Sequence, residues 1–122
     1  MVVVLGVVGF RFVQTVKGPL DAANGYLGDL RARHYGDAYD RLCRPTRAAV
    51  ERDAFVAVMR PRLGGVFRID DFAADPRANV HRDRAEVDVS VTYRGAGSAD
   101  ITLPLEKEGG DWKPCPRPKD LG

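Results

Sequence analysis

The residues that could carry acid–base or nucleophilic chemistry are few and widely spaced in this chain. The histidines are His34 and His81, and the cysteines are Cys43 and Cys115. A zinc site needs about four clustered ligands, often with Cys-x-x-Cys spacing, and the sequence contains no such spacing. We therefore expect no metal site and no cofactor. The spacing of these residues assigns no catalytic group.

Two short motifs match catalytic patterns by chance. The triplet His81-Arg82-Asp83 occurs in the catalytic loop of protein kinases, but a chain of 122 residues is too short for a kinase fold. Gly95-x-Gly97 precedes an expected strand, whereas a phosphate-binding glycine loop precedes a helix. Neither motif supports an activity.

The two cysteines leave two interpretations open. They are either isolated free thiols or the two ends of one long-range disulfide. A disulfide that closes so long a loop would stabilise the fold by roughly 4 kcal/mol, and it would require an oxidising compartment. The spacing of Cys43 and Cys115 does not decide between these alternatives.

Aromatic side chains recur through both halves of the chain and could line a ligand pocket between helices and sheet. The candidate pocket residues are Tyr26, Tyr39, Phe55, Tyr93 and Trp112, with Phe67 in the same set. The alternative is a filled core, because aromatic side chains dominate core burial. If the chain is a small enzyme instead, His34, Tyr39 and Asp40 would lie near the mouth of this pocket.

An apolar run of nine residues opens the chain at positions 2–10, and no polar face interrupts it. We interpret residues 1–18 as part of a membrane anchor, although a full membrane helix needs about 20 apolar residues. Arg11 and Lys17 follow the run and oppose an outward-facing anchor by the positive-inside rule. A buried element of the domain and an inefficient signal peptide are the alternatives.

The charge pattern argues against nucleic acid as a partner. The chain has 19 basic and 17 acidic residues, a formal net charge of +2, and the two signs are interleaved along the sequence. A surface that binds phosphates needs a patch of one sign. The length and the 44% hydrophobic content fit one compact domain.

Helical patterns fill the first half of the chain. Apolar residues recur at helical spacing over 19–33, after Gly18-Pro19. Asp37 can cap a second short helix that Pro45 ends, and Thr46 can cap a third helical segment with a break near Asp53.

Residues after Gly65 alternate with the period of strands. The clearest alternation covers ten residues and predicts one buried and one solvated face, hence an antiparallel sheet. Pro104 and Pro114 imply edge positions or bulges. The expected strands are 66–72, 84–93, 101–105 and 112–115. This order predicts an α+β fold, with N-terminal helices packed on one face of a curved antiparallel sheet meander.

The segment YLGDLRARHYGDAYDRLCRPTRAAVERDAFVAVM, followed by an alternating strand and EGGDWKPC, resembles a family of actinobacterial membrane-anchored proteins. Their domain, of unknown function, belongs to the nuclear-transport-factor-2-like superfamily, whose fold is a cone-shaped, cystatin-like α+β structure. The resemblance covers about residues 19–116 and leaves 117–122 as a flexible tail.

The resemblance implies a transmembrane segment before the domain, a domain that faces outside the cytoplasm, and a disulfide between Cys43 and Cys115. The apolar run, the two cysteines and the lack of a catalytic constellation lead us to expect a non-enzymatic domain that binds an envelope protein or a small apolar ligand, and a homodimer is a further alternative. The superfamily includes isomerases, dehydratases and polyketide cyclases, so a small cone-fold enzyme is the alternative. None of their catalytic residues matches a position here.

Overall fold

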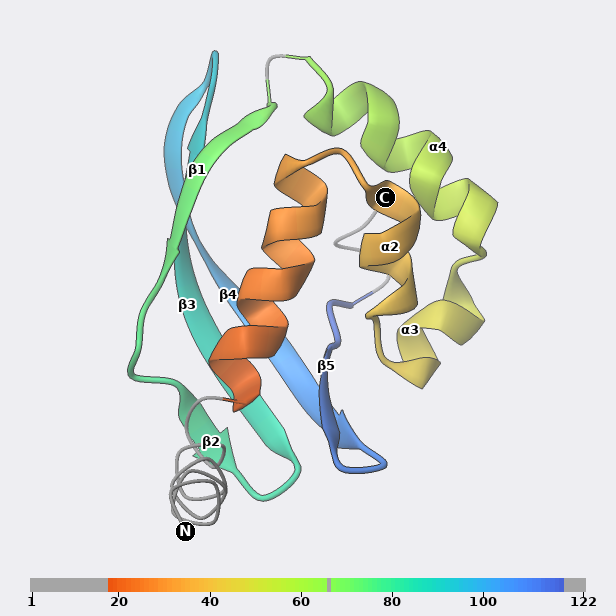
Figure 1. Ribbon diagram of the computed structural model, residues 1–122, viewed down its shortest axis with the longest axis vertical. Helices are drawn as coiled ribbons and strands as arrows, with labels where there is room; N and C mark the ends of the chain where they lie inside the picture. Colours follow the sequence, from red (N-terminus) through yellow and green to blue (C-terminus); the bar gives the residue numbers. More distant parts are fainter. Residues whose placement is uncertain (1–17, 66, 118–122) are drawn as a thin grey trace, which may run out of the picture.

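The computed structural model describes residues 18–65 and 67–117, which form helices followed by a sheet (Figure 1). The apolar run and residues 1–17 of the expected anchor lie outside the described residues, as does most of the expected tail. Among the described residues, no helix combines the length and the hydropathy that crossing a membrane requires.

The first helix spans residues 18–31 and lies along the inside of the sheet (Figure 1). Its apolar residues at helical spacing, Ala23, Leu27 and Leu30, are all buried in the core. The helix ends two residues before the expected boundary because the chain turns there, and Arg33 takes a left-handed conformation with φ of 66°.

Three shorter helices follow: α2 (Tyr35–Asp40), α3 (Arg44–Ala49) and α4 (Arg52–Leu63). The second helix begins two residues before Asp37, so the expected cap lies inside its first turn. Pro45 does not end α2 but lies in the first turn of α3, where its missing N–H has no intrahelical acceptor to lose. The expected break lies between α3 and α4.

The five strands form one antiparallel sheet. The sheet has the order β1-β3-β4-β5, and β2 also pairs with β3. The strands are β1 (Ile69–Ala74), β2 (Asn79–His81), β3 (Arg84–Tyr93), β4 (Gly97–Glu108) and β5 (Asp111–Pro114). The first strand starts three residues later than expected, β2 was not expected, and β4 is longer than expected at both ends.

Alternation along β3 produces the two faces that the sequence predicts. Val87, Val89 and Val91 are almost fully buried, whereas Glu86 and Asp88 are exposed. The adjacent strand contributes two leucines to the same buried face. Ile101, expected there as well, is 36% exposed, because β5 pairs with residues 105–108 and no other described strand flanks this part of β4 on that side.

The two strand prolines lie where a missing N–H costs little. Pro114 lies on the edge strand β5. The carbonyl of Pro104 accepts a hydrogen bond from Cys115 N at 2.7 Å, so the ring nitrogen of Pro104 faces the same side, beyond the last pair of β4 and β5. The expectation of edge positions is confirmed for Pro114.

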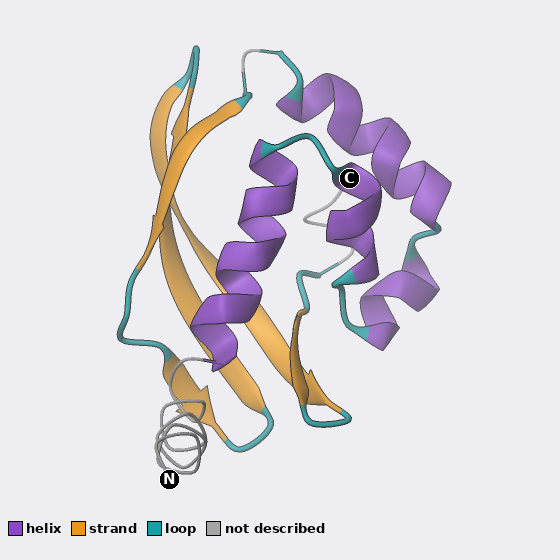
Figure 2. Cartoon of the chain, in the orientation of Figure 1, coloured by secondary structure: helices purple, strands orange, loops and turns teal. Residues whose placement is uncertain are grey.

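The core lies on the inner face of the curved sheet. Helices cover one face of the sheet, with the first helix between the sheet and the group formed by α2, α3 and α4 (Figure 2). Aromatic and aliphatic side chains from both layers form one cluster. The outer face of β3 carries charged side chains in contact with solvent. The predicted α+β architecture is confirmed.

Candidate functional site

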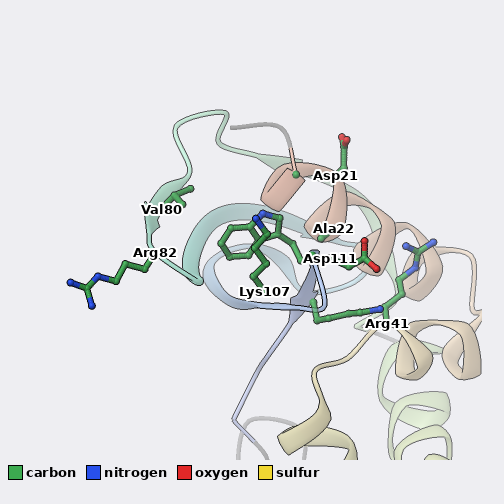
Figure 3. Close-up of a pocket in the computed structure, with 11 residues that line it drawn as sticks. Asp21, Ala22, Arg41, Val80, Arg82, Lys107 and Asp111 are labelled. Atoms are coloured by element: carbon green, nitrogen blue, oxygen red, sulfur yellow. The ribbon is translucent and has the colours of Figure 1, made fainter. Parts of the chain in front are cut away.

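A surface hollow of about 560 Å³ lies where the start of the first helix, the β2–β3 turn and the β4–β5 turn meet (Figure 3). We call it the Trp112 hollow. Its lining includes Gly18, Asp21 and Trp112.

The β4–β5 hairpin positions the indole in the hollow. Lys107 and Trp112 are directly opposed across the two strands, so their side chains share one face of the sheet. The Lys107 ammonium lies 5.9 Å from the centre of the indole ring, within the range of a cation–π contact. Gly109 and Gly110 both have positive φ, which only glycine adopts readily, and they form the tight turn.

The start of the first helix comes unusually close to the indole. A Cβ atom on Gly18 would lie 2.7 Å from Trp112 Cδ1, which is closer than a real side chain can approach. The indole is half-buried and packs against the core from this position. Any side chain at Gly18 would therefore displace Trp112 or the helix start.

The rim of the hollow carries charges of both signs. Asp21 and Asp111 supply carboxylates, and Arg41 and Lys107 supply cations (Figure 3). Arg41 is already engaged, because its Nε donates to Asp29 Oδ2 at 2.6 Å. An aromatic ring of this kind can bury apolar area of a binding partner, and the charged side chains around it can make polar contacts with the same partner.

The five candidate pocket residues all belong to the core cluster or pack against it. Tyr26, Tyr39 and Phe55 are buried in the core, and the rings of Tyr39 and Phe55 lie 5.5 Å apart. Tyr93 makes an edge-to-face contact with Phe67, whose exposed ring lies just before β1. Trp112 alone of these six lines the Trp112 hollow.

The three residues of the enzyme alternative also lie away from this hollow. His34 is exposed at the start of α2. The hydroxyl of Tyr39 lies 2.6 Å from the carbonyl oxygen of Val50 and donates to the backbone there. Asp40 Oδ1 accepts from Arg52 Nε at 3.2 Å. These contacts occupy Tyr39 and Asp40 with structural roles.

The disulfide between Cys43 and Cys115, which the resemblance implies, is present in the structure. It joins the residue before α3 to the residue after β5, across 72 positions of sequence, with 5.1 Å between the Cα atoms. A backbone hydrogen bond from Cys43 N to Pro114 O at 2.8 Å runs beside it. The helices and the last strand are therefore tied together covalently.

A carboxylate lies next to this disulfide. Glu106 Oε2 is 2.8 Å from Cys115 Sγ, and the oxygen and the two sulfurs all lie within 4.8 Å of one another. Three such donors could ligate a metal only as thiolates and a carboxylate. In this structure the sulfurs are bonded to each other and cannot act as thiolate ligands.

Sequence reasoning identified Trp112 but missed its neighbours in the hollow. The signal for Lys107 was present, because a two-residue Gly-Gly turn places Lys107 opposite Trp112. Asp21 and Arg41 come from separate helical segments, and no local pattern links them to the hairpin.

Comparisons with known proteins support the fold. No family model and no curated protein matches the chain. The solved structure of a candidate NTF2-like transpeptidase from Campylobacter jejuni is similar, with a TM-score of 0.60 and 16% sequence identity. The similarity covers 81% of this chain and 98% of that chain. The chain therefore has the nuclear-transport-factor-2-like cone fold that the resemblance implied, and this likeness extends to the fold alone.

Proposed function

Starting from the nuclear-transport-factor-2-like fold, we propose that this chain is a membrane-tethered domain outside the cytoplasm that binds a protein partner and has no catalytic activity of its own. The disulfide between Cys43 and Cys115 is the observation that carries the proposal. Disulfides persist in oxidising compartments and are rare in the cytosol. The apolar run at positions 2–10 supplies the tether.

The filled core supports a binding role over catalysis. Tyr26, Tyr39 and Phe55 belong to the cluster of buried side chains that fills the interior, where a cone-fold enzyme would need a cavity. The Trp112 hollow is then the binding surface. An aromatic anchor within a charged rim is typical of protein interfaces, whereas a small apolar ligand needs mainly apolar walls.

The redox state of the cysteines in native cells tests the location. Cells are lysed in an alkylating reagent, and the peptides are mapped without reduction. We expect a linked Cys43–Cys115 peptide and no alkylated thiol at either position. Extraction of the membranes at alkaline pH tests the tether, and the chain should remain with the lipid. Two alkylated cysteines in native cells would overturn the proposed location.

Two exposed valines allow a matched test of the binding surface. Val80 lines the Trp112 hollow and is 37% exposed, and Val58 lies on α4 and is 36% exposed. A photo-crosslinking residue is placed at each position in turn. We expect a discrete protein adduct in native cells from position 80 and none from position 58. Equal labelling from both positions would contradict binding through the hollow.

A small cone-fold enzyme or binder of a small molecule is the second candidate. It is favoured by the two carboxylates, Asp21 and Asp111, that line the same hollow as Lys107. Trp112 is the sole tryptophan of the chain, so its fluorescence reports on this hollow directly. Titration with small apolar molecules should leave the emission unchanged under our proposal. A saturable shift would favour the second candidate.

A further inference from the structure

The two sulfurs of the disulfide differ in their surroundings. Cys43 is fully buried, whereas Cys115 is partly exposed. Cys115 lines a second surface hollow, together with Glu106 and other residues of β3 and β4. Of the two cysteines, only Cys115 therefore contacts a surface hollow among the described residues, and a thiol from solution would approach the disulfide from its side. Thiol–disulfide exchange depends on which sulfur is accessible.

Negative charge lies next to the accessible sulfur. Glu106 Oε2 is 2.8 Å from Cys115 Sγ, and Glu86 lines the same hollow. Arg84 Nε lies 3.7 Å from the other carboxylate oxygen of Glu106, and its side chain is 82% exposed. Such a solvated ion pair is weak and leaves much of the carboxylate charge in place. Arg117 also lines the hollow and has interactions of its own.

We propose that Cys115 is the modification site at which thiols attack this disulfide, and that Glu106 makes the site select against anionic thiols. In the exchange step a thiolate forms a bond to Cys115 Sγ. The bond between the two cysteine sulfurs breaks, and its electron pair leaves on Cys43 Sγ as a thiolate. Cys115 then carries the mixed disulfide.

The leaving group returns readily. Cys43 Sγ lies in the core, 3.1 Å from the hydroxyl of Thr46, which itself donates to Pro116 O at 2.9 Å. A thiolate released there stays next to Cys115, because the packing of the core holds Cys43 in place. It therefore attacks the mixed disulfide again and restores the original bond. Reduction is completed only when a second thiol captures Cys115 first.

The test uses the purified full-length chain and two small thiols of opposite charge, 3-mercaptopropionate and cysteamine. Rates of disulfide opening are measured for the wild type and for Glu106→Gln. We expect Glu106→Gln to speed the reaction with the anionic thiol by roughly threefold to tenfold, the effect of one unit charge at about 5 Å in a solvent-like medium. The rate with cysteamine should fall or stay unchanged.

Comparing each variant with the wild type for the same thiol cancels the different reactivities of the two reagents. Glu86→Gln is the matched control, because it removes the same charge from the same hollow without touching the sulfur, and we expect less than a twofold effect on either rate. Quenching at early times with acid and mapping the mixed disulfide should place it at Cys115.

Three outcomes would overturn the proposal. The mixed disulfide could map to Cys43, Glu106→Gln could speed disulfide opening equally with both thiols, or the substitution could change neither rate. Equal acceleration would show that the variant merely loosens the segment. The proposal depends on the disulfide and not on the tether or on the partner, so its failure would leave the proposed function standing.

Discussion

At the scale of single residues, buried tyrosines differ in how their hydroxyls are satisfied. Tyr39 donates to the backbone carbonyl of Val50 at 2.6 Å. The hydroxyl of Tyr35 is buried with no hydrogen-bond partner among the described residues. An unsatisfied buried hydroxyl costs free energy, whereas a satisfied one contributes to stability. The two tyrosines lie four residues apart in α2, so they form a matched pair for comparison.

Replacing these tyrosines by phenylalanine should have opposite effects. We expect Tyr35→Phe to raise the free energy of unfolding by about 1 kcal/mol and Tyr39→Phe to lower it by about 1 kcal/mol. Chemical denaturation followed by circular dichroism measures both values. A loss of stability in Tyr35→Phe would mean that its hydroxyl has a partner in solution.

Tyr26 makes stability depend on pH in the alkaline range. Burial raises the pKa of Tyr26 well above its usual value of about 10, because the charged form is poorly solvated in the core. A tyrosine in the unfolded chain ionises near its usual pKa, so the native state is favoured fully below about pH 10 and loses this advantage as the pH rises further.

Tyr26→Phe removes this ionisation. We expect the alkaline unfolding midpoint of the variant to move to higher pH than that of the wild type, while stability near neutral pH changes little. Circular dichroism between pH 8 and 12 measures the midpoint. An unchanged midpoint would assign alkaline unfolding to another group.

At the scale of elements, Thr46 connects α3 to the segment after β5. It lies inside α3 rather than at its cap, is 2% exposed, and donates to Pro116 O at 2.9 Å. Thr46→Val keeps the shape but leaves the carbonyl without its donor. We expect a loss of about 1–2 kcal/mol in the free energy of unfolding.

Thr46→Ser is the control for this contact, since it retains the hydroxyl and removes only a methyl group. It should lose clearly less stability than Thr46→Val in the same denaturation experiment. Equal losses in the two variants would indicate that packing of the methyl group, rather than the hydrogen bond, holds the segment to α3.

At the scale of the whole molecule, the disulfide is the longest-range link. It closes a loop of 72 positions between the helical half and the last strand. We expect the double variant Cys43→Ser/Cys115→Ser to lose roughly 4 kcal/mol of stability in the chain-entropy account. The wild type in excess reductant should unfold at the same denaturant concentration as the variant. A loss under about 1 kcal/mol would contradict this role for the bond.

The sequence by itself determined most of the elements and the two faces of β3, although it did not predict β2 or the full length of β4. Alternation over 84–93 predicted β3 to the residue and also which side of it is buried. Side chains alternate between the two faces of a strand and recur on one face of a helix every three or four residues. The local sequence pattern therefore shows which side chains face the core and which face solvent. Helix ends were less well predicted, because Pro45 and Asp37 are compatible with several positions in a first turn.

Only the tertiary structure decided what comes together. Residue spacing left the cysteines as free thiols or a pair, and the fold places their Cα atoms 5.1 Å apart with Glu106 beside them. The five aromatic residues of the predicted pocket all join or pack against the core cluster, and their three-dimensional positions, not their residue type, decide which are buried and which line a hollow. Tyr26 and Phe55 are buried in the core, while Trp112 is half-buried and lines the Trp112 hollow.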